Sequence, residues 1–155
     1  MKDPQPILLL VPMAVAFVTV ICTFIIHALP LMATINFVRR ERKLGHVGVH
    51  FRRDMTIVIR VILYAFLAHL IEMAVWAALF EVCGEFSDFP TAYYHSAVNY
   101  TSLGYGDIIM SPTWKLLGPM ETADGMLLFG VSTAMIFAVI QRMVETRFAD
   151  LRTNT

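Results

Sequence analysis

The segment Thr101–Asp107 reads TSLGYGD, and its chemistry would come from the backbone rather than from side chains. Gly104 and Gly106 are separated by one residue, and glycine readily adopts left-handed backbone conformations that other residues resist. A chain that alternates in handedness can aim consecutive carbonyl oxygens at one axis. Rings of such oxygens can replace the hydration shell of a cation. One chain supplies one oxygen to each ring, so complete rings require several copies of the chain.

A short helix is predicted directly before this segment. Pro90–Tyr100 is amphipathic, and proline is favoured at the start of a helix. The whole stretch Glu81–Asp124 is too short and too polar to hold a further membrane span with its loops. Non-helical backbone at membrane depth must be buried in protein or line water. We therefore expect Pro90–Tyr100 to enter a membrane part-way and to present the glycine-rich segment to one of those two environments.

The composition predicts an all-α membrane protein with several spans. Of the 155 residues, 57% are hydrophobic and 15% are charged, whereas soluble domains are about 45–50% apolar and about 25% charged. Three apolar blocks, Ile7–Leu29, Met55–Phe80 and Gly125–Gln141 with its flanks, are long enough to cross a bilayer as helices. Twelve basic and twelve acidic residues cancel, which argues against nucleic acid as a partner.

The basic residues predict the orientation. The stretch between the first two blocks contains Arg39, Arg40, Arg42, Lys43, Arg52 and Arg53. The segment Glu81–Asp124 contains one lysine and six acids. By the positive-inside rule, the basic stretch and the C-terminus lie in the cytoplasm and the N-terminus lies outside. The first block exceeds the apolar core of a signal peptide, so we expect it to stay as a span. The expected location is the plasma membrane, as a multi-pass protein of a prokaryotic inner membrane.

The order of these parts resembles the pore module of potassium channels. The filter of that family reads T-V-G-Y-G followed by Asp, and residues 104–107 match it outright as GYGD. Ser102 stands in the place of the family's inner threonine, and Leu103 in the place of its valine. A short helix precedes the motif, a proline-containing turret follows at residues 108–119, and an inner helix comes next. The resemblance runs from Met55 to the end of the chain.

The resemblance implies a homotetramer with three transmembrane helices, a re-entrant pore helix and a filter loop in each subunit. The implied filter residues are Thr101, Ser102, Leu103, Gly104, Tyr105 and Gly106. Potassium would bind the carbonyl oxygens of residues 102–105 and the Ser102 hydroxyl. Tyr105 would pack against the pore helices, and Asp107 would concentrate cations at the outer mouth. Because Ser102 and Leu103 depart from the family pattern, a weakly selective monovalent cation channel stays an alternative. A non-conducting membrane subunit is a third possibility.

The third apolar block is expected to line the pore. In many channels of this class two glycines lie five apart in the inner helix, as Gly125 and Gly130 do here, and the first acts as a hinge. The predicted lining face is Phe129, Thr133, Phe137 and Gln141, at intervals of four residues. Phe137 could form a hydrophobic constriction that gates by dewetting. The alternative is that Gly130 and Ala134 mark close helix contacts instead.

Several ionisable residues lie in or near the apolar blocks. His69 and Glu72 share one helix face, and we expect a hydrogen bond between them, with Glu72 also bonding to the third block or the short helix. Such groups are candidate functional sites. Proton modulation by His95 is possible, although packing or a hydrogen bond to the filter is favoured. Glu121 and Asp124 are expected at the outer start of the inner helix, where carboxylates suit the helix dipole.

A membrane cytochrome with His27 and His69 on one haem is a different class of function. Counted from the outer face, His27 lies about 30 Å deep and His69 about 16 Å deep, at 1.5 Å per residue. The sequence therefore predicts that one iron cannot reach both histidines. No other arrangement of residues is typical of an enzyme or of a structural metal site.

We interpret the chain as a potassium-selective channel rather than an enzyme, with no cofactor and with membrane lipids around it. The expected domains are an additional N-terminal transmembrane helix at 1–38, a basic cytoplasmic loop at 39–54, a pore module at 55–146 and a short tail at 147–155.

Overall fold

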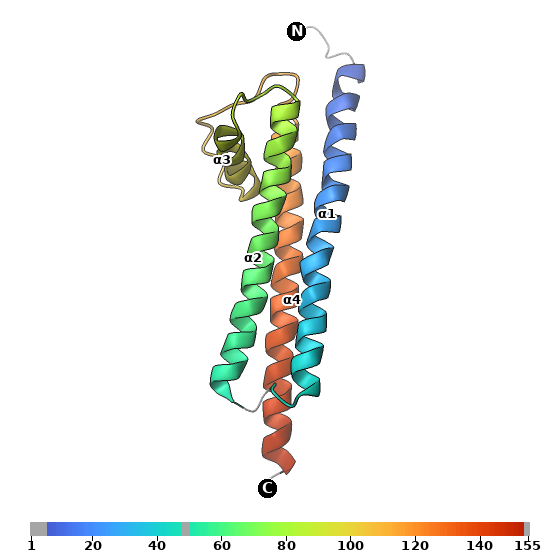
Figure 1. Ribbon diagram of the computed structural model, residues 1–155. Coiled ribbons are helices and arrows are strands. Elements are labelled where there is room, and N and C mark those ends of the chain that lie inside the picture. Colours follow the sequence, from blue (N-terminus) through green and yellow to red (C-terminus); the bar gives the residue numbers. More distant parts are fainter. Residues whose placement is uncertain (1–5, 48–49, 154–155) are drawn as a thin grey trace.

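The computed structural model describes residues 6–47 and 50–153, and within them it consists of helices without strands. In chain order the helices are α1 (Pro6–Lys43), α2 (Phe51–Val82), α3 (Phe89–Tyr100) and α4 (Leu117–Thr153). The three long helices lie side by side, and the short α3 lies beside one end of α2 (Figure 1). That end also holds the start of α1, so residues 101–107, which we call the filter segment after their predicted role, share one end of the bundle with the start of α1 (Figure 1).

Three helical stretches are long and apolar enough to cross a membrane: Leu10–Lys43, Phe51–Val82 and Leu117–Phe148. Large apolar side chains are exposed on their outer faces, including Phe17, Leu63 and Phe66. Lipid rather than water suits such surfaces, because helices satisfy their own backbone groups in a bilayer. The all-α, multi-pass architecture predicted from the sequence is confirmed.

The helix ends differ from the predicted ones. α1 continues through Pro30 to Lys43, so much of the expected basic loop at 39–54 is helical. Arg40, Arg42 and Lys43 occupy the last turn of α1, where cations stabilise the helix dipole. α4 begins at Leu117, well before Gly125, because a Gly-Pro pair early in a helix does not interrupt it.

The short helix α3 is predicted correctly and starts one residue earlier than expected. Asp88 is its N-cap, and the Asp88 side chain accepts a hydrogen bond from the Thr91 backbone N–H at 3.0 Å. Pro90 lies in its first turn. At the other end, the Thr101 hydroxyl donates to the Ala97 carbonyl at 2.7 Å. Both ends of α3 are therefore capped, and the filter segment follows directly after its C-terminal end.

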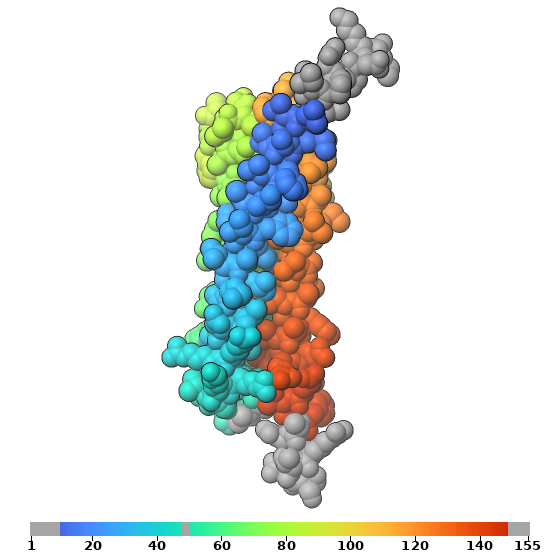
Figure 2. Space-filling model, turned by 90° about the vertical axis from the view of Figure 1, so that its right-hand side faces the viewer, coloured from blue at the N-terminus to red at the C-terminus, as the bar shows by residue number. Residues whose placement is uncertain are grey.

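The additional helix α1 and the pore helix α3 lie on different sides of the α2–α4 pair. α1 packs on α2 and on α4, and α3 packs on the same two helices. In Figure 2, α1 lies along α4 over much of the face turned to the viewer. α1 does not pack on α3 directly. An effect of α1 on the filter segment would therefore pass through side chains of α2 or α4.

Candidate functional site

The filter segment leaves α3 with alternating backbone handedness. Ser102, Gly104 and Gly106 have φ values of 61°, 58° and 70°, and Leu103 and Tyr105 between them do not enter the positive region. This alternation is the one expected from the two glycines. Ser102 is the one non-glycine with positive φ among the described residues, a conformation that costs about 1–3 kcal/mol and is typical of functional sites.

Backbone hydrogen bonds hold the start of the filter segment against α3. The N–H groups of Leu103 and Gly104 both donate to the Val98 carbonyl, at 2.9 and 3.2 Å. The Ser102 N–H donates to the Asn99 carbonyl at 2.9 Å. Three successive N–H groups are thus turned toward the end of the pore helix, and the position of α3 fixes the position of these residues.

The outer end of the segment is tied to α3 by a side chain. The Tyr94 hydroxyl donates to an Asp107 carboxylate oxygen at 2.8 Å. This hydrogen bond raises the pKa of Tyr94, because it stabilises the protonated phenol. A second tie joins the turret to the end of α2, where Glu85 accepts from the Ser111 hydroxyl at 2.5 Å and from its N–H at 2.7 Å.

The filter side chains are exposed in the single chain. Tyr105 is 66% exposed and Leu103 is 53% exposed. Neither glycine of the motif has atoms within 4 Å of the place where a Cβ would stand. The subunit therefore presents an open, partly apolar filter surface that its own side chains do not cover.

The four residues of the predicted lining face are exposed on α4, namely Phe129, Thr133, Phe137 and Gln141. Phe137 is 65% exposed. Phe129 is 37% exposed, and its ring packs 4.4 Å from the His69 ring and 5.5 Å from the Tyr100 ring, between centroids. Phe129 therefore packs partly behind the filter segment, whereas the Phe137 side chain is largely uncovered by its own chain.

Gly125 packs closely against the end of α3, a role that the sequence had indicated for Gly130 and Ala134. A Cβ at Gly125 would lie 2.3 Å from the Tyr100 carbonyl oxygen, so only glycine lets α4 approach the end of α3. At Gly130 no atom lies within 4 Å of the same position. The close contact considered for Gly130 and Ala134 is found at Gly125 instead, and Gly130 is sterically open within the subunit.

Glu121 and Asp124 do not lie at the exposed mouth. They are 0% and 1% exposed, because α4 starts at Leu117 and carries both acids into the bundle. A Glu121 oxygen accepts from the Ser96 hydroxyl at 2.5 Å. One Asp124 oxygen accepts from the Thr23 hydroxyl at 2.8 Å and from the Trp76 indole N–H at 2.9 Å. The expectation that both acids lie at the start of the inner helix is wrong, since α4 begins at Leu117 and both acids join helices in the interior.

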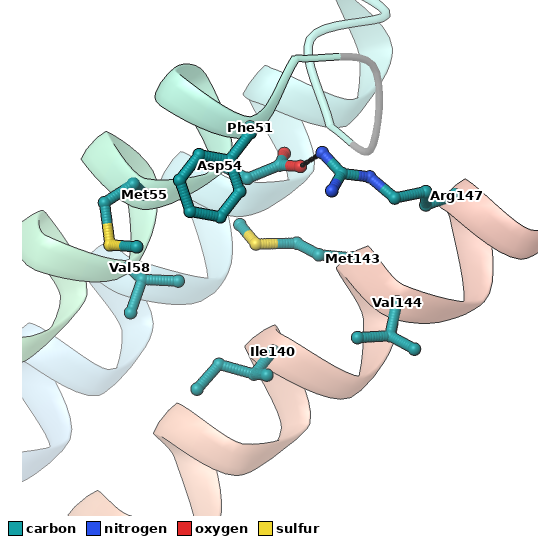
Figure 3. Close-up of a pocket in the computed structure, with 8 residues that line it drawn as sticks. All are labelled: Phe51, Asp54, Met55, Val58, Ile140, Met143, Val144 and Arg147. Carbon is teal, nitrogen blue, oxygen red and sulfur yellow. Dashed lines mark hydrogen bonds and ion pairs between the residues drawn. The ribbon is translucent and has the colours of Figure 1, made fainter.

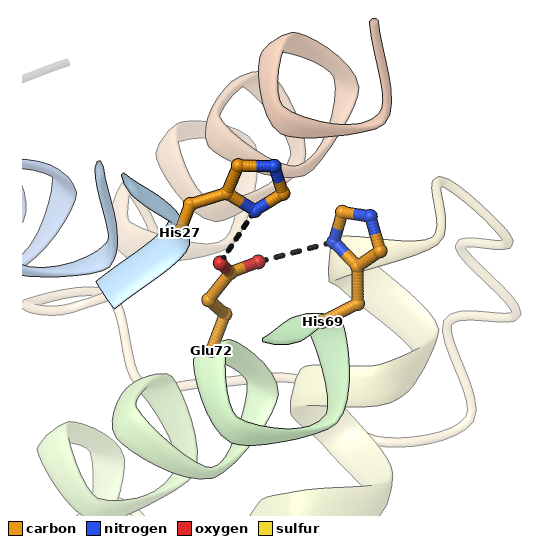
Figure 4. A group of neighbouring side chains, drawn as sticks. All are labelled: His27, His69 and Glu72. Carbon is orange, nitrogen blue, oxygen red and sulfur yellow. Dashed lines mark hydrogen bonds and ion pairs between the residues drawn. The ribbon is translucent and has the colours of Figure 1, made fainter. Parts of the chain in front are cut away.

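Glu72 is the centre of a buried polar cluster (Figure 4). The predicted contact with His69 is confirmed, at 3.0 Å from its Nδ1. The predicted contact with the short helix is confirmed as well, since the Tyr100 hydroxyl donates to Glu72 at 2.5 Å. The third partner is His27 of α1, whose Nδ1 lies 2.8 Å from Glu72 Oε1 and which was not predicted from the sequence.

The depth argument that separated His27 from His69 is wrong. Their ring centroids are 5.2 Å apart. The end of α1 at Lys43 is connected to the start of α2 at Phe51, and residues 27–43 and 51–69 are of nearly equal length. At the end away from this connection, α1 extends further than α2 (Figure 1). Counting residues from that end therefore assigned different depths to the two histidines. Counting from the connection would have placed the histidines side by side.

The two histidines still do not suit a shared haem. Both nitrogens of each ring are already hydrogen-bonded, Nδ1 to the accepting Glu72 carboxylate and Nε2 to the Ser132 hydroxyl. The donor atoms of His27, His69 and Glu72 do lie within 4.8 Å of one another, and this is a ligand set that zinc uses in proteins. These three side chains are the group among the described residues that could hold a metal ion.

His95 packs as expected rather than facing the filter opening. Its ring lies 5.0 Å from the Phe86 ring and 5.5 Å from the Phe80 ring, between centroids. Its Nε2 lies 2.8 Å from the Asn99 amide nitrogen. Burial lowers the pKa of His95, because it penalises the imidazolium form.

Comparison with known families agrees with the geometry of the site. A family described as "Ion channel" matches residues 56–142, which is more than half of the chain. The chain therefore belongs to this ion-channel family, and its fold and site define a multi-pass membrane channel. The match covers nearly all of α2, all of α3 with the filter segment, and much of α4, and it leaves α1 outside. Searches of curated proteins and of solved structures found no match.

Proposed function

We propose that this protein is a potassium-selective channel in which four copies of the chain surround one pore. The observation that carries the proposal is the alternation of positive φ at Ser102, Gly104 and Gly106 directly after the pore helix. In this arrangement the carbonyl oxygens of residues 102–105 form stacked rings that replace the hydration shell of K⁺. The Ser102 hydroxyl forms the innermost ring, and Asp107 attracts cations to the outer mouth.

The exposed surfaces of the subunit support assembly. One chain gives one oxygen to each ring, and Leu103, Tyr105 and Phe137 are largely uncovered. Neighbouring subunits cover the first two, and Phe137 faces the pore as its hydrophobic constriction. Gly130, which is sterically open, is the preferred hinge of α4. The basic residues between the spans support an orientation with the α1–α2 connection and the C-terminus on the cytoplasmic side of a plasma membrane.

Rubidium uptake into potassium-loaded liposomes tests the proposal. Uptake that external potassium blocks and sodium does not is the expected result. In Gly104→Ala the uptake should be lost, because alanine at φ 58° strains the filter backbone. Gly45→Ala is the matched control, since Gly45 also has positive φ, at 67°, and open space around it, but lies in the cytoplasmic connection. Equal loss in both variants would show that the effect is general destabilisation.

Two alternative outcomes have specific meanings. Equal block by sodium and potassium would identify a weakly selective cation channel, and the missing methyl group at Ser102 would be the first cause to test. A tetramer that takes up no rubidium in any variant would identify a non-conducting subunit. For the constriction, Phe137→Ala should raise open probability, and unchanged conductance and open probability in both Phe137→Ala and Phe137→Asp would exclude that role.

A further inference from the structure

A groove of about 320 Å³ lies between α1 and α4, toward the end of the bundle where α1 is connected to α2. The two helices lie side by side along the face shown in Figure 2. Volumes of about 300–1,000 Å³ are typical of small-molecule sites. Its wall is largely apolar, and three arginines also line it; the residues that matter here are Val38, Met135 and Val139 with Arg39, Arg42 and Arg142. The described residues that line this α1–α4 groove include no acid.

The three arginines lie at one end of the α1–α4 groove. α1 and α4 run in the same direction (Figure 1). On α1 the last lining residues are Arg39 and Arg42, and on α4 the last one is Arg142. The apolar lining residues, such as Met135, come earlier on both helices. The groove therefore has an apolar part that leads into a cationic end, which is the pattern that an amphiphile with an anionic headgroup would match.

The cationic end lies at the level of lipid headgroups. Arg39 and Arg42 lie near the end of Leu10–Lys43, a stretch long and apolar enough to cross a membrane. At 1.5 Å per residue, α1 rises about 44 Å from Leu10 to Arg39. A bilayer with its headgroup regions is about 40–45 Å thick. The apolar part of the groove is therefore at the depth of acyl chains.

Two of the three arginines are available to bind an anion. Arg142 forms an ion pair with Glu145 at 3.1 Å. Arg39 and Arg42 are exposed, and neither forms an ion pair within the part of the chain that the structure describes. The acid between them in the sequence, Glu41, is paired elsewhere. Because guanidinium groups present forked N–H donors that match phosphate oxygens, these two side chains suit a phosphate group.

The groove lies on the side of α4 away from the predicted pore-lining face. Met135 and Val139 follow Thr133 and Phe137 by two residues each, which is about 200° around an α-helix. When Thr133 and Phe137 face the pore, the groove faces away from it. In the tetramer proposed above, the groove is therefore turned toward the surrounding lipid.

We propose that the α1–α4 groove binds one anionic glycerophospholipid, with its phosphate on Arg39 and Arg42 and an acyl chain along Met135 and Val139. The lipid would connect α1, which lies outside the family match, to the inner helix α4. It would therefore help to hold α4 in place where the contacts between helices are mainly apolar. The role of the lipid in holding an inner helix, and its place in the cytoplasmic leaflet, rest on the function and orientation proposed above, whereas the binding itself does not.

Native mass spectrometry of the detergent-solubilised protein tests the binding. The probes are phosphatidylglycerol and phosphatidylcholine with the same acyl chains, titrated separately. One phosphatidylglycerol per subunit should bind at least about tenfold more tightly than phosphatidylcholine, because a zwitterionic headgroup brings no net negative charge to the arginines. Equal affinity for the two lipids would overturn the proposal.

Two double variants separate the groove from the general charge of this helix end. Arg39→Gln combined with Arg42→Gln should weaken phosphatidylglycerol binding about tenfold or more. Arg40→Gln combined with Lys43→Gln is the matched control, since it removes two charges from the last turn of α1 and neither residue lines the groove. The control should keep the wild-type affinity. Equal losses in both double variants would overturn the site in favour of diffuse attraction.

Filling the apolar part of the groove tests the acyl-chain contact. Ala138 lines the groove and is exposed, so Ala138→Trp should block the lipid with the arginines unchanged. Its unfolding midpoint in lipid-free detergent should stay near that of wild type. Inorganic phosphate should not displace the lipid, because it lacks the acyl chain. Displacement by inorganic phosphate, or wild-type lipid binding in Ala138→Trp, would reassign the arginines to a free anion and overturn the lipid site.

Unfolding midpoints in nanodiscs test whether the lipid stabilises the folded chain. The nanodiscs contain either phosphatidylcholine alone or equal parts of phosphatidylcholine and phosphatidylglycerol. A ligand that binds only the folded state raises the midpoint, so phosphatidylglycerol should raise it in wild type and in the Arg40/Lys43 control but not in the Arg39/Arg42 variant. The same midpoint for wild type in both lipids would overturn the stabilising role.

Two further outcomes are distinguishable. Loss of the assembled oligomer in Ala138→Trp, with no lipid bound to wild type, would assign the groove to a neighbouring copy of the chain and overturn the lipid as its occupant. If wild type takes up no rubidium, the proposed function fails, while lipid binding and the unfolding midpoints still decide the site.

Discussion

After the orientation proposed above, we call the half of the bundle that contains the filter segment the outer half and the half that contains the α1–α2 connection the cytoplasmic half. Both halves have an apolar core, but the outer half adds a network of buried hydrogen bonds between helices. Around the filter, buried hydrogen bonds centred on Glu72, Glu121 and Asp124 join all four helices. The cytoplasmic half is packed by Val47, Ile57, Val61, Ala65, Met135, Val139 and Met143. An ion pair between α2 and α4, Arg147 with Asp54 at 3.0 Å, lies at the margin of an apolar pocket (Figure 3).

This difference matches what each half of a channel must do. The hydrogen bonds around the filter are directional, so they favour one arrangement of the helices there, although Glu121 Oε2 and Asp124 Oδ1 are buried without a hydrogen-bond partner. Apolar contacts are non-directional, and methionines such as Met135 and Met143 adapt to shifted neighbours. We therefore expect the outer half to stay fixed and α4 to move more readily in the cytoplasmic half.

The largest effect is expected when the polar centre is broken. Glu72→Gln should destabilise the subunit by about 3 kcal/mol or more, because its amide N–H₂ stands where the carboxylate accepts from His27 and Tyr100, and each buried donor that loses its acceptor costs about 1–3 kcal/mol. Glu145→Gln is the matched change in the cytoplasmic half, where Glu145 pairs with Arg142 at the surface, and it should cost less than about 1 kcal/mol. Unfolding midpoints in detergent measure both, and equal costs would contradict the contrast between the halves.

The second test compares two glycines of α4. Gly125→Ala should cost about 1–3 kcal/mol or more, because its Cβ would meet the Tyr100 backbone. Gly130→Ala has open space and should gain up to about 1 kcal/mol from helix propensity. The fraction of assembled channel on size-exclusion chromatography, together with the unfolding midpoint, measures both. A tolerated Gly125→Ala would mean that α4 can slide at the filter.

The third test uses the same substitution twice on α1. Thr23 and Thr34 are both fully buried, but Thr23 donates to Asp124 whereas the Thr34 hydroxyl is without a hydrogen-bond partner. Thr23→Val should cost about 1–3 kcal/mol by leaving Asp124 short of a donor. Thr34→Val should be neutral or stabilising by about 1 kcal/mol. A reversed order of the two unfolding midpoints would contradict the division into polar and apolar halves.

The smallest effect is expected at the cytoplasmic ion pair. Arg147 is 42% exposed, so Arg147→Gln should cost less than about 1 kcal/mol. The cost should fall further in high salt, because exposed charges are screened. An effect that is large or independent of salt, measured from unfolding midpoints at two ionic strengths, would show that this pair fixes the position of α4.

Local features of the fold and site could be predicted from the sequence, whereas contacts between helices could not. The short helix and the alternating backbone at Gly104 and Gly106 depend on neighbouring residues, so the sequence predicts them well. The burial of Glu121 depends on where α4 begins, and Gly118-Pro119 was interpreted as part of a turret although it also suits a helix start. The pairing of His27 with Glu72 depends on the register of two antiparallel helices, which the sequence does not encode locally.

The hydrogen bonds that α1 gives to Glu72 and Asp124 have an evolutionary consequence. A two-span descendant of this chain would leave both acids short of a donor in lipid, so loss of α1 requires replacement of Glu72 and Asp124 at the same time. We therefore expect α1, which lies outside the family match, to be retained, because no single change removes it without leaving these acids short of a donor. Among three-span relatives, residues at positions 23 and 124, and at positions 27 and 72, should change together.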